Sequence, residues 1–203
     1  MSATLELAGW RRSVADLYAG VRATRDRDPQ GAHARWRQGR DALFRAHPQS
    51  PLGPAARERF AGLRYLPYDP ELAFTVPVDT DVTEETHEIA ASTGPSLAFC
   101  RVGRVHLPVG DLDVFWLDAY GGGLFLPFRD ATAGEETYGG GRYLLDTVKG
   151  ADLGATVDGR LVCDFNFAYH PSCHYDPAWS CPLAPAGSHL EERIEAGEQS
   201  WDA

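Results

Sequence analysis

Apolar side chains near the N-terminus recur at three- and four-residue intervals, with charged residues between them. Residues at this spacing share one face of a helix, so the pattern predicts an amphipathic helix. The apolar face consists of Trp10, Val14, Leu17, Tyr18 and Val21. A second helix is expected between Asp28-Pro29, an N-cap residue followed by proline, and Pro48, which cannot continue a helix. A short third helix is expected over residues 54–61, with Gly62 ending it.

Beyond residue 62 the pattern changes to short segments rich in aromatic and β-branched residues, separated by Gly, Pro or Asp. Such segments are typical of strands. They cover residues 72–78, 97–102, 104–107, 113–120, 124–128 and 161–169. Tight hairpin turns are predicted at Val102-Gly103-Arg104 and at Asp158-Gly159, the latter of type I′. No helical pattern of ten or more residues separates these strands, so the sheet should be antiparallel.

Helices followed by a run of strands predict an α+β protein. We expect N-terminal helices followed by a mainly antiparallel β-barrel-like or sandwich domain. With 203 residues and 43% apolar content, the chain can bury one sizeable core. The expectation is therefore a single domain over residues 1–203, with a helical segment at 1–62 and a β domain at 63–203.

The net charge of −10 argues against generic binding to nucleic acid or to an anionic membrane, because phosphate contacts require a basic surface. The charge is unevenly distributed, with a net of +6 over residues 1–64 and −16 over residues 65–203. We interpret this split as basic helices docked onto an acidic body. An alternative is a partner-binding surface that uses Arg35, Arg37 and Arg40. The sequence does not indicate the oligomeric state.

The chain has no run of about 18 apolar residues, and its N-terminus, with Glu6, Arg11 and Arg12, lacks the uninterrupted apolar stretch of a signal peptide. The expectation is a soluble cytoplasmic protein. In that compartment its four cysteines would be reduced thiols or ligands rather than structural disulfides.

A glycine triplet follows the polar loop at residues 129–136. Glycine permits backbone angles closed to other residues and lets amide groups approach a ligand. Tyr138, the amides of Gly139, Gly140 and Gly141, and the guanidinium of Arg142 could therefore form a site for an anion. The turn lacks the ending of a phosphate-binding P-loop and the spacing of a dinucleotide fingerprint. The structural alternative is a sharply bent strand.

The predicted strand at residues 161–170 alternates apolar and polar side chains. Because side chains alternate across a strand, Asp164, Asn166 and His170 would share one face. If that face lines a lumen, these groups could bind a ligand or act as acid, base and orienting residue. If the face is exposed to water, the same pattern describes an ordinary half-buried strand.

Histidines and cysteines cluster after this strand, at His170, Cys173, His174 and Cys181. Imidazole and thiolate are the usual zinc ligands, although the spacing matches no standard finger or ribbon. Cys173 beside His174 could alternatively form a reactive thiolate–imidazolium pair. A third interpretation is that these side chains pin a proline-rich crossing segment. No serine lies in the Gly-x-Ser-x-Gly turn of a hydrolase, which argues against a serine triad.

Several stretches together resemble the domain-of-unknown-function family 1684, which is common in bacteria. They are residues 123–130 with Gly134 and the 137–143 turn, 164–169 with Pro171 and Cys173, and 181–183 with 196–198. Upstream, the resemblance rests on Trp36, Asp41, Phe44, 50–52, Phe60, 62–63, Tyr65 and Pro67. Where the family carries a Pro-Pro-Glu-Asn-Arg-Leu run, residues 185–190 differ in this chain. The resemblance implies a soluble, stand-alone, largely β protein, and the family has no assigned activity.

Three functions are consistent with the sequence. The first is binding of a small polar or anionic molecule in a pocket between the 137–143 turn and the 161–170 strand. The second is an enzyme with a metal or reactive-thiol centre, zinc being the metal that this ligand set would suit. The third is a structural or partner-binding protein. The sequence names neither a substrate nor a reaction.

Overall fold

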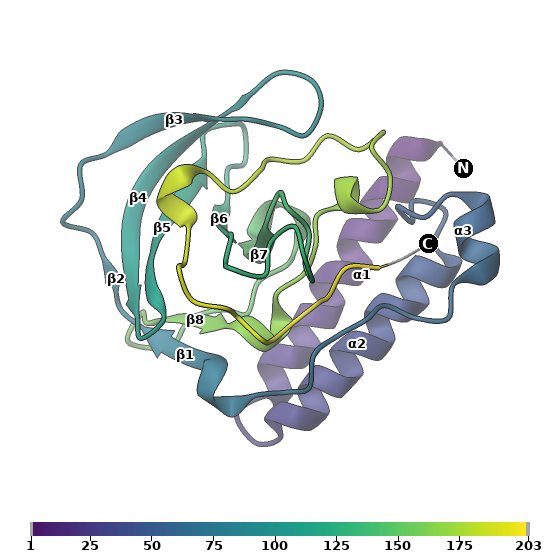
Figure 1. Ribbon diagram of the computed structural model, residues 1–203, viewed down its shortest axis with the longest axis horizontal. Helices are drawn as coiled ribbons and strands as arrows, with labels where there is room; N and C mark the ends of the chain where they lie inside the picture. The colour runs from purple at the N-terminus through teal and green to yellow at the C-terminus, as the bar shows by residue number, and fades with distance from the viewer. Residues whose placement is uncertain (1, 202–203) are drawn as a thin grey trace.

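The computed structural model describes residues 2–201 (Figure 1). Two long helices, α1 (Ala3–Thr24) and α2 (Pro29–Ala46), form an antiparallel pair, and the short α3 (Pro54–Arg59) follows. The predicted start of α2 is confirmed, because the Asp28 carboxylate accepts a hydrogen bond from the Gly31 amide at 2.9 Å. Proline occupies the first turn of both α2 and α3.

The main sheet has six antiparallel strands. They are β2 (Val78–Asp79), β3 (Glu85–Ile89), β4 (Leu97–Leu107), β5 (Gly110–Leu117), β6 (Leu124–Phe128) and β7 (Arg142–Asp146). Their order is β2-β4-β5-β6-β7, with β3 also paired to β4. A separate two-stranded sheet joins β1 (Ala73–Val76) to β8 (Leu161–Asp164). The predicted antiparallel pairing is confirmed, and the fold is α+β.

Five short 3₁₀ helices interrupt the loops of the described chain. They are η1 (Pro70–Leu72), η2 (Thr147–Lys149), η3 (Phe165–Phe167), η4 (Ser172–His174) and η5 (Ala186–Ser188). η2 and η4 follow β7 and the 165–171 segment, and they place the polar groups described below.

The predicted barrel does not form. The main sheet is open, with β2 and β3 both on one edge of β4 and β7 at the other end of the order. The 161–169 segment does not close it. β8 ends at Asp164 and pairs with β1, and beyond it only an isolated bridge between Tyr169 and Tyr143 reaches β7. A sandwich-like arrangement of antiparallel sheets with helices alongside describes the fold better (Figure 1).

The predicted hairpin turn at residues 102–104 is wrong. β4 runs straight through it, with a register shift between Arg101 and Gly103, and the chain reverses only before Gly110. The absence of a side chain at Gly103 instead lets β2 lie close to β4. A Cβ there would lie 2.4 Å from Val78 Cγ1 and 3.0 Å from the Asp79 carbonyl oxygen. Glycine is therefore needed where β2 pairs with β4.

The turn at Asp158-Gly159 is confirmed as a turn, since the Thr156 amide donates to the Arg160 carbonyl at 2.9 Å. It is not of type I′, which needs a positive φ at both central residues. Gly159 has φ 81°, and every positive φ among the described residues belongs to a glycine.

One large core joins the helices to the sheet. Tyr18 and Val21 of α1 and Trp36 of α2 pack with strand residues such as Phe115 and Phe125. A smaller cluster of Phe44, Leu52, Phe60 and Leu63 lies beneath α3. No helix within residues 2–201 has the length and apolar character needed to cross a membrane.

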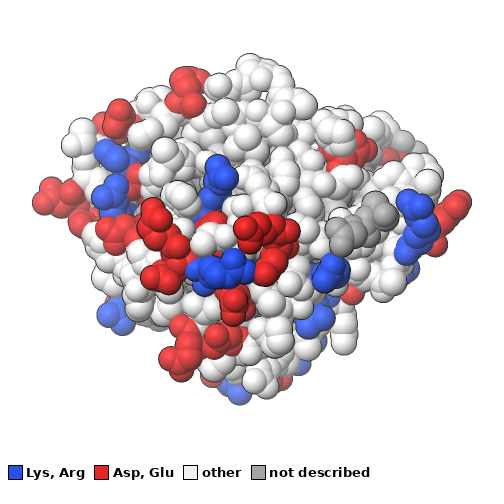
Figure 2. Space-filling view, in the orientation of Figure 1, with Lys and Arg blue, Asp and Glu red and all other residues white. Residues whose placement is uncertain are grey.

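Acidic and basic side chains are interspersed on the face of the molecule in Figure 2. Two arginines of the basic N-terminal part contact the acidic remainder. Arg40 pairs with Glu198 at 2.8 Å, and Arg22 donates to the Asp152 carbonyl.

Candidate functional site

The glycine turn folds back on the protein itself. The Gly141 amide donates to the Tyr138 carbonyl at 2.9 Å, and the Gly140 carbonyl accepts from the Ala184 amide at 3.2 Å. A Cβ at Gly140 would lie 2.9 Å from Leu183, and one at Gly141 would lie 2.5 Å from the Phe128 carbonyl oxygen. These two glycines are therefore required for close chain packing, and Gly139 continues the same turn.

Arg142 lies in the interior, with 1% of its surface exposed. Its guanidinium donates to the carbonyls of Ile194, Ala196 and Glu198 at 3.0, 2.5 and 3.3 Å and pairs with Asp130 at 3.2 Å. Burial lowers the pKa of Arg142, although Asp130 acts in the opposite direction. These contacts engage the predicted anion-binding group with protein acceptors and hold the C-terminal segment.

Asp164 and Asn166 form a hydrogen-bonded link to the loop before β1. One Asp164 oxygen accepts from the Asn166 amide at 3.0 Å and from its side chain at 2.8 Å. The Asn166 side chain in turn exchanges two bonds with the Asp69 backbone, at 2.7 and 2.8 Å. Burial raises the pKa of Asp164 to about 6, against the effect of Asn166.

The predicted alternating strand is therefore wrong beyond Asp164. Asp164 caps η3 through its bond to the Asn166 amide, which turns the chain out of the extended conformation. All ten residues from 161 to 170 are buried, so the segment has no polar face open to a lumen. Asp164 and Asn166 are hydrogen-bonded to each other, and Asn166 also to Asp69. Arg142 shares none of these partners, since it binds Asp130 and the C-terminal segment.

His170 is buried beside the glycine turn. Its Nε2 accepts from the Tyr138 amide at 3.1 Å, and its own amide donates to Glu198 at 2.9 Å. Burial, followed by the charges of His174 and Arg142, lowers the pKa of His170 well below its usual value. The neutral ring then carries its proton on Nδ1, which has no partner among the described residues.

Cys173 and Cys181 form a thiol pair. Both are free and buried, and each shifts the pKa of the other. The Cys173 sulfur lies 3.7 Å from the Tyr138 hydroxyl. Donation from Cys181, opposed by burial, lowers the pKa of Cys173 to about 6, and the same pairing raises that of Cys181.

The predicted metal centre does not assemble. Within residues 2–201 no three His, Cys, Asp or Glu side chains are grouped so that they could hold a metal ion. His170 uses Nε2 as a backbone hydrogen-bond acceptor, and Cys173 and Cys181 contact each other. The ring of His174 lies against that of His170, with 4.3 Å between the ring centroids and a tilt of 43°, and it accepts a hydrogen bond from the Trp201 amide at 3.3 Å.

A small cavity that is lined in part by Cys181 lies next to these cysteines, and we call it the Lys149 cleft. Its volume is about 190 Å³. Helix α1 contributes Leu7, Trp10 and Arg11. The remaining wall comes from Gln49, Lys149, Ser172, Trp179, Ser180 and Cys181. Segments distant in the sequence thus converge on one small space.

Lys149 lies at a junction of cavities. It also lines a cavity of about 130 Å³ beside β6 and one of about 50 Å³ that reaches His170. Its ammonium pairs with Asp146 at 3.2 Å, and its side chain keeps 41% of its surface exposed. Burial lowers the pKa of Lys149, but Asp146 and Cys181 more than offset this, so the net direction is upward.

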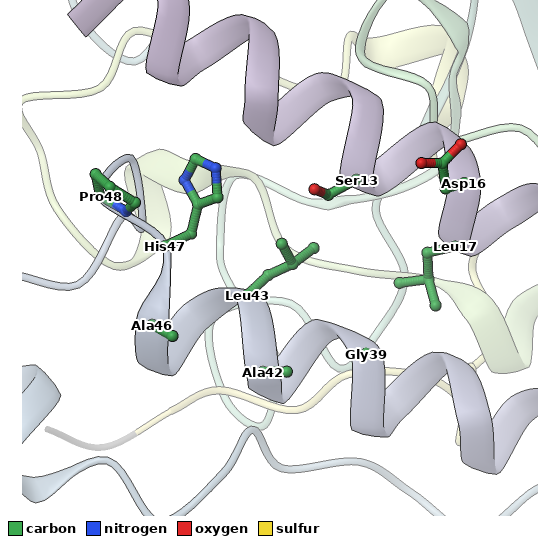
Figure 3. Close-up of a pocket in the computed structure, with 9 residues that line it drawn as sticks. All are labelled: Ser13, Asp16, Leu17, Gly39, Ala42, Leu43, Ala46, His47 and Pro48. Atoms are coloured by element: carbon green, nitrogen blue, oxygen red, sulfur yellow. The ribbon is translucent and has the colours of Figure 1, made fainter. Parts of the chain in front are cut away.

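A groove of about 670 Å³ lies between α1 and α2 (Figure 3). Its walls are mostly small or apolar residues of both helices, such as Gly39, Ala42 and Leu43. Asp16 is the one carboxylate among its described lining residues, and no lysine or arginine lines it. Such a groove offers few groups that would orient a polar ligand.

Sequence reasoning missed Lys149, although a signal was present. Lys149 is the only lysine in the 203-residue chain, whereas arginine occurs at every other basic position. Ser172, Ser180 and Arg11 gave no comparable signal, because nothing local shows that helix α1 faces the 172–181 loop.

The fold and this site define an α+β protein with a small cationic cleft beside a buried thiol pair. The chain belongs to the family described as "Protein of unknown function (DUF1684)", whose profile matches residues 58–199, and the resemblance seen in the sequence is thereby confirmed. No curated protein matches.

A solved structure shares the fold. It is the solution NMR structure of the uncharacterized protein from gene locus rrnAC0354 of Haloarcula marismortui, 33% identical to this chain. The match covers 87% of this chain and 96% of the other, with a TM-score of 0.58. The description of this relative names no activity.

Proposed function

We propose that the protein binds a small anionic molecule, such as a carboxylate or phosphate, in the Lys149 cleft. The observation that carries the proposal is the charge of the lining. Two cations, Lys149 and Arg11, line the cleft, and no carboxylate does so among the described residues, in a chain whose net charge is −10. A bound anion would relieve the repulsion between the two cations.

Electrostatics support a charged Lys149. Arg11 acts to lower the pKa of Lys149, which places the two positive groups within each other's field. Asp146 raises that pKa and fixes the ammonium through the 3.2 Å pair. Lys149 is therefore an ammonium at neutral pH and can donate further hydrogen bonds to an anion.

The rest of the lining suits a small ligand. Ser172, Ser180 and Gln49 provide polar groups, while Trp10 and Trp179 provide apolar walls. Sites of this kind combine mainly apolar walls with a few polar groups that orient the ligand. The volume of about 190 Å³ is below the roughly 300–1,000 Å³ typical of pockets for drug-sized molecules, which favours a small ligand.

This location differs from the pocket that the sequence suggested between the glycine turn and the 161–170 segment. Both terminal nitrogens of Arg142, one oxygen of Asp164 and the side chain of Asn166 are engaged with protein partners. The polar groups of the Lys149 cleft, in contrast, include the partly exposed ammonium of Lys149.

The test is a thermal-shift titration with inorganic phosphate, acetate, citrate and pyruvate at constant ionic strength. A ligand at 100 times its Kd stabilises a folded protein by about 2.7 kcal/mol, which is a measurable rise in Tm. We expect at least one of these anions to raise the Tm of the wild type. Lys149→Gln should weaken the binding of that anion roughly tenfold or more, because a charge-assisted hydrogen bond contributes about 1.5–3 kcal/mol.

Arg160→Gln is the matched control, because Arg160 is an exposed cation outside the cleft, with 52% of its side chain accessible. It should leave the anion response unchanged. The proposal is wrong if none of the four anions shifts the Tm, or if Lys149→Gln and Arg160→Gln respond alike. Unliganded Tm values of both variants show whether either substitution disturbs the fold.

A further inference from the structure

The cavity that reaches His170 adjoins the Lys149 cleft, and we call it the inner cavity. Its volume is about 50 Å³. Trp10, Lys149 and Ser172 line both spaces, so the two share a wall. Because a cavity of roughly 10–15 Å³ already admits a water molecule, the inner cavity has room for an oxygen-bearing group. A molecule held at Lys149 could therefore extend into it.

Two side chains that line the inner cavity have a buried polar atom without a hydrogen-bond partner among residues 2–201. They are His170, at Nδ1, and Tyr18, at its hydroxyl. Only 2% and 1% of their surfaces are exposed. A buried polar group without a partner destabilises the fold, so such a group in a native protein needs an explanation. One oxygen atom in the inner cavity could satisfy both.

Both groups are hydrogen-bond donors. His170 Nε2 accepts from the Tyr138 amide at 3.1 Å, so the neutral ring carries its proton on Nδ1. Burial raises the pKa of Tyr18 above its ordinary value, so the phenol keeps its proton. The nearby indole of Trp36 opposes this shift, but its nitrogen makes no hydrogen bond of good geometry within the described chain. A molecule in the inner cavity must therefore offer an acceptor.

The charges around the inner cavity indicate a neutral acceptor. Two cations, Arg40 and Lys149, line it, and no carboxylate does so among the described residues. Arg40 is already neutralised, since it pairs with the fully buried Glu198 at 2.8 Å. Most of the remaining lining is aliphatic or aromatic. A second carboxylate would thus be buried without a cation of its own, which is costly, whereas a carbonyl or hydroxyl oxygen would not.

We propose that the ligand of the Lys149 cleft is a small hydroxy or oxo acid. Its carboxylate pairs with Lys149 and Arg11 in the cleft, and its neutral oxygen lies in the inner cavity, where it accepts from His170 Nδ1 and the Tyr18 hydroxyl. This ligand class rests on the anion-binding function proposed above and narrows it. His170 and Tyr18 then determine specificity, because donors left without an acceptor disfavour an acid that lacks the oxygen.

The test compares pyruvate with propionate, which has the same charge and a similar size but lacks the keto oxygen. Thermal-shift titrations at constant ionic strength measure both affinities. We expect pyruvate to bind the wild type roughly tenfold or more tightly, because the keto oxygen accepts from two buried donors. Lys149→Gln should weaken both acids alike. Tyr18→Phe should weaken pyruvate about threefold to tenfold and leave propionate unchanged, because it removes one hydroxyl.

Tyr120→Phe is the matched control, because Tyr120 is fully exposed, and it should keep the wild-type preference for pyruvate. Equal binding of the two acids, or a response to phosphate alone, overturns the ligand class and leaves the anion site intact. An unchanged preference in Tyr18→Phe overturns the role of Tyr18. If no anion binds, the proposed function fails, and the ligand class with it. The wild-type comparison decides the matter even if Tyr18→Phe is unstable.

Discussion

At the scale of single residues, burial decides which polar groups are available for function. Asp164, Asn166 and Arg142 carry the chemistry that a binding site would need, yet each is buried and bonded to protein groups. Lys149 keeps 41% of its side chain exposed beside a cavity, although only its rarity marks it in the sequence. Residue type alone could not separate these cases, because burial depends on contacts with distant segments.

The raised pKa of Asp164 predicts how the stability of the protein depends on pH. Its pKa in the folded protein, about 6, lies above its ordinary value of 3.8. The folded state therefore holds the proton more tightly than the unfolded state, and ionisation lowers the free energy of unfolding as the pH rises through about 6. Asp164→Asn keeps an acceptor for Asn166 but removes the charge. Relative to wild type, it should gain roughly 2–3 kcal/mol of stability between about pH 4 and about pH 7.

Urea denaturation of both proteins across this pH range checks the prediction. Other groups near this carboxylate, including Arg25, Tyr68 and Asp69, are common to both proteins, so the difference isolates Asp164. A difference that stays constant with pH would show that Asp164 ionises normally in the fold.

At the scale of elements, local pattern predicted the helices well and the strand ends less well. The apolar spacing of α1 and the Asp28-Pro29 cap of α2 act within a few residues, so the sequence contains them in full. Gly103 resembles a turn residue locally, but it permits the close approach of β2 to β4. β8 stops at Asp164 because a side-chain cap competes with strand pairing.

Gly103→Ala is expected to destabilise the protein by roughly 1–3 kcal/mol, because its Cβ would overpack against Val78 and the Asp79 carbonyl. Gly20→Ala is the opposite case, since Gly20 lies near the C-terminal end of α1 and no neighbouring atom lies within 4 Å of the added methyl. It should stabilise the protein by about 0.5–1 kcal/mol. Urea denaturation of both variants decides the matter: equal effects would mean that close packing at Gly103 does not limit the substitution.

At the scale of the whole molecule, the C-terminal segment, yellow in Figure 1, runs across the fold. Two buried arginines hold it in place. Arg142 binds three of its carbonyls, and Arg40 of α2 pairs with the fully buried Glu198. Tyr175 and the His170 amide complete the shell around that carboxylate. Burial raises the pKa of Glu198, and these partners oppose the shift.

Arg142→Ala should therefore cost at least about 3 kcal/mol, since it leaves the buried Asp130 charge and several carbonyls without a partner. The control is Arg193→Ala, which removes an exposed arginine that pairs with Glu136 and should have a much smaller effect on stability, because water screens an exposed ion pair. Chemical denaturation measures both. Equal losses in the two variants would contradict a structural role for Arg142 and return it to the candidates for ligand binding.

The sequence by itself determined the two long helices, the predominance of antiparallel strands and the family. These properties depend on side-chain periodicity, caps and motifs that act over short stretches of chain. Only the tertiary structure decided that the sheet is open, that Arg142 faces the C-terminal segment more than 50 residues away, and that Lys149 meets Arg11 across a cleft. The physical reason is that burial, hydrogen-bond partners and cavities arise from contacts between distant segments, which no local pattern records.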